Sequence, residues 1–256
     1  MERNKETIVF IHGYSNTPNM WASTINHFEA FNCITLDMNI FGEELLAENK
    51  KISTVNYAHK VQDYLISINV QKFHLIGHSM GGYISAAFAS LFSDCLLSLT
   101  LVHAILGSEI EEKMPIKLKS INLIQKGDLE RQAFLKALVN NLFYTNFRKN
   151  NPDLVQHYIE VANSLNPTLI IEQYKAIIER PDLRNIVNDL KFPIHWMVGT
   201  HDKVVPPPYA LEEITSSPKA FISTFNEVGH MAMDESLDVF TKQLKSYIQI
   251  IQEYYP

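Results

Sequence analysis

A serine between glycines is the first feature of this chain that could do chemistry. The stretch L-I-G-H-S-M-G-G, residues 75–82, holds three of the nine glycines among 256 residues and contains the pattern Gly-x-Ser-x-Gly around Ser79. It follows an apolar run and precedes a segment with helical spacing. Such a sharp strand-to-helix turn leaves no room for side chains at Gly77 and Gly81, and it exposes the serine hydroxyl. Ser79 is therefore a candidate nucleophile, and a helix N-cap is the structural alternative.

A serine hydroxyl is a poor nucleophile without a base, and the base needs a group that orients it. Asp202 follows an apolar run in V-G-T-H-D, and His230 follows the next run in V-G-H-M. The chain order serine, aspartate, histidine is one of the three orders in which the catalytic triad occurs. We predict that Asp202 orients His230. His103, at the end of an earlier run, is the rival of His230 for the role of base.

The loop after the first apolar run offers hydrogen-bond donors. The stretch I-V-F-I-H-G-Y ends at Tyr14. If the second and third strands lie on opposite sides of the first, a crevice opens between this loop and the serine turn. The backbone N–H groups of Tyr14 and Met80 can then form an oxyanion hole, unless the loop is an ordinary strand-ending turn. We assign substrate contact to Gly13 and His78, with His78 turned away from the serine hydroxyl.

Six short apolar runs predict the elements that must position these residues. Parallel strands that are covered on both faces give continuous apolar runs of this kind, and the segments between them have helical spacing. Alternating strands and helices predict a doubly wound, mostly parallel α/β sheet. The runs are Thr7–Ile11, Cys33–Leu36, Phe73–Ile76, Leu99–Val102, Ile194–Val198 and Phe221–Phe225.

The interval 107–191 breaks this alternation. It contains no convincing strand, and helical patterns occur over 129–143, 152–165 and 167–178. The interval is too long for a plain loop, so we predict an inserted helical subdomain between the fourth and fifth strands. The core domain then comprises residues 1–106 and 192–256. Aromatic residues of the insertion are expected to pack its helices together, with lining of an apolar pocket as the alternative.

Composition excludes several classes of partner. There are 22 basic and 28 acidic residues, a net charge of −6, and no basic cluster suited to a nucleic acid. No apolar run approaches the roughly 20 residues that span a bilayer, and the first residues do not resemble a secretory signal, so we expect a cytoplasmic protein. The two cysteines lack a metal-ligand spacing. We expect no metal, no organic cofactor and a small-molecule substrate; the oligomeric state stays open.

Four motifs together give the chain a resemblance to the α/β-hydrolase superfamily. They are His12-Gly13, the nucleophile turn over 77–82, the acid loop over 199–202 and Gly229-His230. The resemblance implies that Ser79 is the nucleophile, His230 the general base and then acid, and Asp202 the orienting carboxylate. It also implies backbone oxyanion donors at Tyr14 and Met80, and a cap domain formed by the helical insertion.

The chain departs from the family's pattern in two places. Many members have two antiparallel strands before the His-Gly loop, but the six residues that precede Thr7 here are too few for that hairpin. We therefore expect a six-stranded sheet without the first two strands. The stretch 37–42 lacks the glycine and histidine of the family's usual Asp-x-x-Gly-His-Gly loop, which leaves the conformation at this edge of the pocket open.

Hydrolysis of a small carboxylic ester through an acyl-enzyme is the predicted reaction. Serine at the nucleophile position argues against dehalogenases and epoxide hydrolases of the same fold, which carry aspartate there. The same triad also suits hydrolysis of carbon–carbon, lactone or thioester bonds. A small-molecule receptor without turnover is the alternative from a different class, because a fold alone does not determine function.

Overall fold

A single parallel sheet organises the chain. The computed structural model describes residues 5–255, and its sheet has six strands in the order β2-β1-β3-β4-β5-β6. The predicted strands are confirmed, although β4 begins at Leu96 rather than Leu99. Their bounds are β1 Thr7–Ile11, β2 Asn32–Leu36, β3 Phe73–His78, β4 Leu96–Val102, β5 Ile194–Gly199 and β6 Ala220–Phe225.

The strand order reverses at β1, because β2 and β3 lie on opposite sides of it, as supposed from the sequence. Val9 pairs with Ile34 of β2 on one side and with Leu75 of β3 on the other, and every pairing in the sheet is parallel. The carboxyl ends of all six strands therefore share one edge. Parallel sheets bind their ligands along this edge, at the point where the order reverses.

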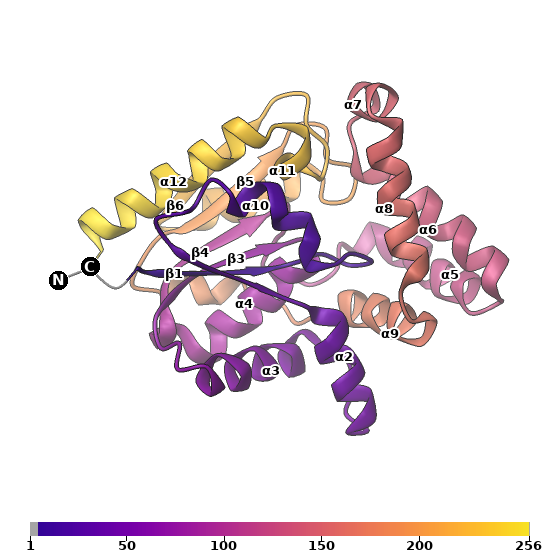
Figure 1. Cartoon of the computed structure of the whole chain (residues 1–256), viewed down its shortest axis with the longest axis horizontal. Helices are drawn as coiled ribbons and strands as arrows, with labels where there is room; N and C mark the ends of the chain where they lie inside the picture. The colour runs from indigo at the N-terminus through magenta and orange to yellow at the C-terminus, as the bar shows by residue number, and fades with distance from the viewer. Residues whose placement is uncertain (1–4, 256) are drawn as a thin grey trace.

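Helices cover both faces of the sheet (Figure 1). On one face α1 (Ala22–Ile25) contacts α12 (Leu237–Tyr254), and on the other α3 (Thr54–Ser67) packs against α4 (Met80–Phe92). The four central strands β1, β3, β4 and β5 are buried on both sides, which explains their continuous apolar sequences, whereas the edge strands β2 and β6 are partly exposed. The remaining core helices are η1 Pro18–Trp21, α2 Met38–Ala47, η2 Ser93–Cys95, α10 Pro207–Ser216 and α11 Ala232–Glu235.

The segment between β4 and β5 is helical and lies beside the carboxyl edge of the sheet (Figure 1). The predicted helical insertion is therefore present, while its boundaries at 107 and 191 stay a prediction. Its helices are η3 Glu111–Lys113, α5 Met114–Ile124, α6 Asp128–Leu142, α7 Thr145–Asn150, α8 Pro152–Ser164, α9 Pro167–Ile178 and η4 Arg184–Asn188. Helix α5 was not among the helices predicted from periodicity. Its apolar residues Ile116 and Leu118 are 70% and 50% exposed, so they mark no buried face.

Aromatic residues of the insertion mostly pack its helices together, as expected. The Phe143 ring stacks on Phe147 at 5.8 Å and lies 5.5 Å from Tyr158. Two of them also reach the core domain: Tyr174 lies against Tyr14 at 5.4 Å and lines the cavity that contains Ser79, and the Tyr144 ring lies 4.4 Å from His201.

The stretch that departs from the usual family loop begins a helix. The Asp37 side chain accepts a hydrogen bond from the Asn39 N–H and caps α2. The Met38 N–H donates to His12 Nε2 at 2.9 Å, which ties this helix to the loop after β1. Within residues 5–255, none of the helices combines the length and the apolar character that a bilayer span needs.

Candidate active site

Ser79 lies at the turn between β3 and α4 in a conformation that is unusual for a residue with a side chain. Its φ is 52° and its ψ is −117°. Such strain is typical of functional sites. A Cβ at Gly77 would collide with the backbone of Gly81, and a Cβ at Gly81 would collide with the backbone of Ile11. Both glycines are therefore required, as the sequence pattern predicts. Ser79 occupies the N-cap position of α4, but within residues 5–255 its side chain makes no capping hydrogen bond.

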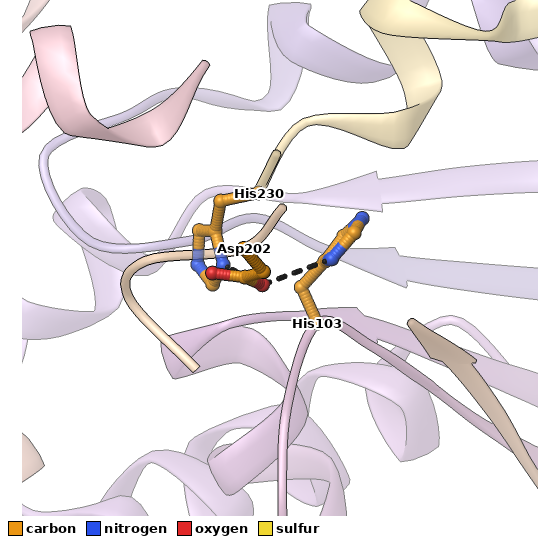
Figure 2. Close-up of side chains that lie close together, drawn as sticks. All are labelled: His103, Asp202 and His230. Atoms are coloured by element: carbon orange, nitrogen blue, oxygen red, sulfur yellow. Dashed lines mark hydrogen bonds and ion pairs between the residues drawn. The ribbon is translucent and has the colours of Figure 1, made fainter. Parts of the chain in front are cut away.

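The loops after β5 and β6 bring Asp202 and His230 together (Figure 2). His230 Nδ1 lies 2.7 Å from Asp202 Oδ2. Asp202 Oδ1 accepts hydrogen bonds from the N–H groups of Val204 at 2.8 Å and Val205 at 2.9 Å. These two backbone donors hold the carboxylate in a fixed orientation, so that Oδ2 remains directed at the imidazole. The predicted acid and base are in direct contact.

His103, at the end of β4, shares the same carboxylate oxygen (Figure 2). Its Nδ1 lies 3.1 Å from Asp202 Oδ2, and the Ala232 N–H donates to its Nε2 at 3.2 Å. A backbone N–H can only donate, so His103 Nε2 is an acceptor and the His103 proton is on Nδ1. Unlike His230, His103 does not line the cavity that contains Ser79. Its position therefore suits contact with the acid and not the role of base.

These three side chains place possible metal-ligand atoms within 4.8 Å of one another. The hydrogen bonds assign the atoms differently, because His103 Nδ1 carries a proton and Asp202 Oδ2 receives two N–H donors. A metal ion at this point would have to displace both protons and both hydrogen bonds. The three side chains therefore fit a carboxylate hydrogen-bonded by two imidazoles better than a metal centre.

Burial and hydrogen bonding together set the ionisation of the pair. Burial by itself raises the pKa of Asp202, but His230 and His103 hold that pKa well below its usual range. Burial lowers the pKa of His230, and the Asp202 charge opposes this shift only in part. The pair therefore consists of a carboxylate and a neutral imidazole with its proton on Nδ1. His230 Nε2 keeps its lone pair and has no hydrogen-bond partner in the part of the chain that the structure describes.

Ser79 and His230 line one cavity of about 90 Å³. Among the hydrogen bonds of residues 5–255, none joins Ser79 Oγ to His230 Nε2. In sites without substrate this bond is often long, and it tightens when substrate binds. The fold thus brings the predicted nucleophile and base to the same cavity without closing the bond between them.

The predicted oxyanion donors lie on the two loops that meet at this cavity. Tyr14 lines it, and its hydroxyl donates to the Ile170 carbonyl of α9 at 3.0 Å. Met80 is the first residue of α4, and the first N–H groups of a helix have no acceptor within it. A Cβ at Gly13 would lie 2.5 Å from His78 Nδ1, so the loops touch. Binding of an oxyanion by these two amides stays a prediction.

His78 lines the cavity and supports the loop that carries His230. Its Nε2 donates to the His230 carbonyl at 2.8 Å, and the two rings lie 4.9 Å apart. Burial holds the pKa of His78 well below its ordinary value, so the ring is neutral. Contact of His78 and Gly13 with a substrate stays a prediction.

Glu235 is a residue of the site that sequence reasoning missed. Its Oε1 accepts from the N–H groups of Gly229 at 3.0 Å and Met231 at 3.2 Å, on either side of the base. Its Oε2 accepts from the Tyr144 N–H of the insertion at 2.8 Å. The His230 N–H itself donates to the Leu142 carbonyl at 2.6 Å. The histidine loop is thereby attached to the insertion. The acidic pair at 234–235 was visible in the sequence, but nothing there indicated its partners.

Comparison with known proteins agrees with this fold. The family model described as the alpha/beta hydrolase fold matches residues 6–237, nearly the whole chain. The protein belongs to the α/β-hydrolase family, which confirms the resemblance seen in the motifs.

The individual relatives are distant. A 2-hydroxy-6-oxononadienedioate/2-hydroxy-6-oxononatrienedioate hydrolase of Paraburkholderia phymatum is 25% identical, over 95% of this chain and 87% of that one. The structure of an esterase from Thermogutta terrifontis has a TM-score of 0.86 at 19% identity, covering 97% of this chain and 91% of that chain. The enol-lactonase of Burkholderia xenovorans has a TM-score of 0.83 at 17% identity, covering 96% and 92%. At these identities the two structures show a shared fold.

Proposed function

We propose that this protein is a serine hydrolase that cleaves a small carboxylic ester through an acyl-enzyme intermediate. The observation that carries the proposal is the state of His230. Its Nδ1 is bound to Asp202 at 2.7 Å, its Nε2 has no partner among the described residues, and it lines a cavity together with Ser79. A neutral imidazole oriented by a carboxylate beside a serine hydroxyl is the arrangement that activates serine.

In the first half of the reaction His230 Nε2 takes the Ser79 proton as Oγ attacks the ester carbonyl. The Tyr14 and Met80 amides stabilise the oxyanion of the tetrahedral intermediate. Asp202 stabilises the imidazolium without taking its proton. The intermediate then expels the alkoxide, which receives that proton, and the acyl group stays on Ser79.

In the second half His230 removes a proton from water, which attacks the acyl carbonyl. A second tetrahedral intermediate collapses, Ser79 recovers its proton from His230, and the acid leaves. The insertion serves as a cap in this scheme, because α6 and α9 contribute Leu138, Leu142 and Ile177 to the cavity wall. These apolar side chains exclude bulk water from the acyl-enzyme.

Cleavage of a carbon–carbon or lactone bond is the second candidate reaction. Two relatives that are 25% and 24% identical to this chain are named 2-hydroxy-6-oxononadienedioate/2-hydroxy-6-oxononatrienedioate hydrolases. The same three side chains serve either chemistry, so the discriminating measurement is a substrate panel. Esters and thioesters graded by acyl and alcohol size, lactones and a vinylogous 1,5-diketone are assayed side by side.

The test of the nucleophile is Ser79→Ala. We expect this variant to fold normally and to lose hydrolysis of short p-nitrophenyl esters by a factor of about 10⁴ or more, because the acyl-enzyme cannot form. Ser90→Ala, an exposed position on the same helix, is the matched control and keeps its activity. Turnover retained in Ser79→Ala would refute the proposal.

A fluorophosphonate probe separates an enzyme from a receptor of the same fold. Rapid labelling of Ser79 together with multiple turnover supports the enzyme. Labelling with no turnover across the whole panel favours a receptor, in which binding matters more than hydrolysis.

A further inference from the structure

One wall of the cavity carries a positive charge. Lys117 of α5 lines the same cavity as Ser79 and His230, and its side chain is only 16% exposed. Its neighbours in this wall include the apolar side chains of Leu138 and Ile177. A lysine in such surroundings costs free energy unless its ammonium group has partners. The partners of Lys117 therefore indicate what the cavity accepts.

The carboxylate beside Lys117 is already neutralised. Glu109 is 3% exposed and pairs with both Lys117 and Arg180, the latter at 2.7 Å. The Arg180 guanidinium also donates to the carbonyls of Gly107 at 3.0 Å and Ser108 at 2.9 Å, which fixes it in place. Two buried cations thus share one anion, and the cluster has a net positive charge.

The other carboxylates near the site have donors of their own. Asp202 accepts from Val204, Glu213 from the N–H groups of Leu106 and Gly107 at 2.7 Å, and Glu235 from the histidine loop. Lys113 donates to the Val204 carbonyl at 2.6 Å, and burial lowers its pKa, a shift that the Asp202 charge opposes only in part. Among the ion pairs of residues 5–255, the partner of Lys117 is Glu109, which shares its charge with Arg180. An ammonium group has three donors, and Lys117 has one described hydrogen bond, to Glu109. Two of its N–H donors therefore have no partner among the described hydrogen bonds, and the side chain lines the cavity.

We propose that the substrate carries a carboxylate group that Lys117 binds in this cavity. The inference deepens the proposed ester hydrolysis and rests on it. A carboxylate would supply the missing negative charge and accept the two remaining N–H donors, in surroundings where a charge-assisted hydrogen bond is strong. The substrate class is then a half-ester of a dicarboxylic acid, or an ester whose alcohol part bears the carboxylate.

The test variant is Lys117→Met, which keeps the length and apolar contacts of the side chain. Glu109 retains Arg180 as its partner in this variant, so no buried charge is left unpaired. Lys119→Met is the matched control, because Lys119 lies on the same helix and is exposed.

The activity test compares monomethyl esters of linear dicarboxylic acids with methyl alkanoates of the same chain length. Acetate esters of ω-hydroxy acids test a carboxylate on the alcohol side. We expect the wild type to prefer one carboxylate-bearing series, and Lys117→Met to lose about 10- to 100-fold in kcat/KM on that series alone, mainly through KM. Equal losses on charged and neutral esters, or no preference in the wild type, overturn the inference.

A binding measurement tests Lys117 independently of the chemistry. Calorimetry with hexanedioate is expected to show binding to the wild type and to Lys119→Met, and at least tenfold weaker binding to Lys117→Met. The neutral 1,6-hexanediol is the reference ligand. Failure of Ser79 to react with a fluorophosphonate would refute the proposed hydrolase. Absence of carboxylate-dependent binding would refute the Lys117 site.

Discussion

Asp202 is the residue on which the ionisation of the site depends. Its carboxylate accepts two backbone N–H groups on one oxygen and two imidazole N–H groups on the other. A buried carboxylate without such donors would take up a proton. The hydrogen bonds instead keep Asp202 charged, and this charge fixes the tautomer of His230. His103 completes the set, and we propose that it positions the Asp202 carboxylate.

Replacement of His103 tests this role through a pH profile. In His103→Ala the Asp202 carboxylate loses a donor, so its charge stabilises the His230 imidazolium more strongly and the pKa of His230 rises. We expect the acidic limb of kcat/KM to move to higher pH and the plateau to fall by about tenfold. His103→Asn is the conservative variant. Asparagine tolerates the φ of 51° at this position and keeps a donor near Nδ1. We expect His103→Asn to restore most of the rate. If the pH profile of kcat/KM were unshifted in both variants, the role of His103 would be merely structural.

At the scale of elements, the histidine loop depends on its attachment to the insertion. Glu235 of α11 binds the backbone on both sides of His230 and also the Tyr144 N–H just beyond α6. Tyr158 of α8 adds a second link, because its hydroxyl donates to Asp234 at 2.7 Å. The position of His230 is therefore coupled to the packing of the insertion and not to the sheet alone.

Glu235→Ala removes three hydrogen bonds from this attachment. We expect a loss of about 2 kcal/mol in the free energy of unfolding, because three N–H groups lose their partner. The amides of Tyr144 and Gly229 should also exchange hydrogen faster. Glu227→Ala, an exposed position in the preceding turn, is the control for both measurements. Unchanged amide exchange in Glu235→Ala would mean that the loop is held by other contacts.

At the scale of the whole molecule, folding buries neutral imidazoles far from the cavity. His195 of β5 is fully buried, its ring lies 4.6 Å from Tyr247, and its Nε2 lies 2.8 Å from Ser223 Oγ. Burial lowers its pKa from 6.5 to about 3. The unfolded chain therefore binds a proton at this residue below about pH 6.5, and the folded chain does not until about pH 3.

This difference predicts a stability that declines with acidity. The free energy of unfolding contributed by His195 is fully present above pH 6.5 and falls by about 1.4 kcal/mol per pH unit between pH 6 and 4. His195→Phe keeps the aromatic contact with Tyr247 and should remove that slope in urea titrations at several pH values. His157→Phe, at an exposed position on α8, should leave the slope unchanged. Identical slopes in all three proteins would contradict the assignment.

The amino-acid sequence by itself determined the strands, the serine turn and the place of the insertion. These features are local. A buried parallel strand must be a continuous apolar run, and the backbone contacts at Gly77 and Gly81 exclude a side chain. The position of β1 between β2 and β3 was only supposed from the sequence, and the fold confirms it. The fold brings Asp202 into contact with His230 and places Ser79 on the same cavity. The catalytic roles of these residues stay predictions.

Only the tertiary structure decided which other groups reach the site. His103 meets Asp202 across 99 positions of the chain, and Glu109 shares its charge with Arg180 across 71. Several apolar residues of helix α5, which carries Lys117, are exposed. Their spacing in the sequence therefore does not mark a buried helix face. The distance between side chains on different elements depends on strand register, twist and helix docking. Local spacing does not encode these quantities, so the partners of Asp202 and the charge of the cavity wall emerged only from the folded chain.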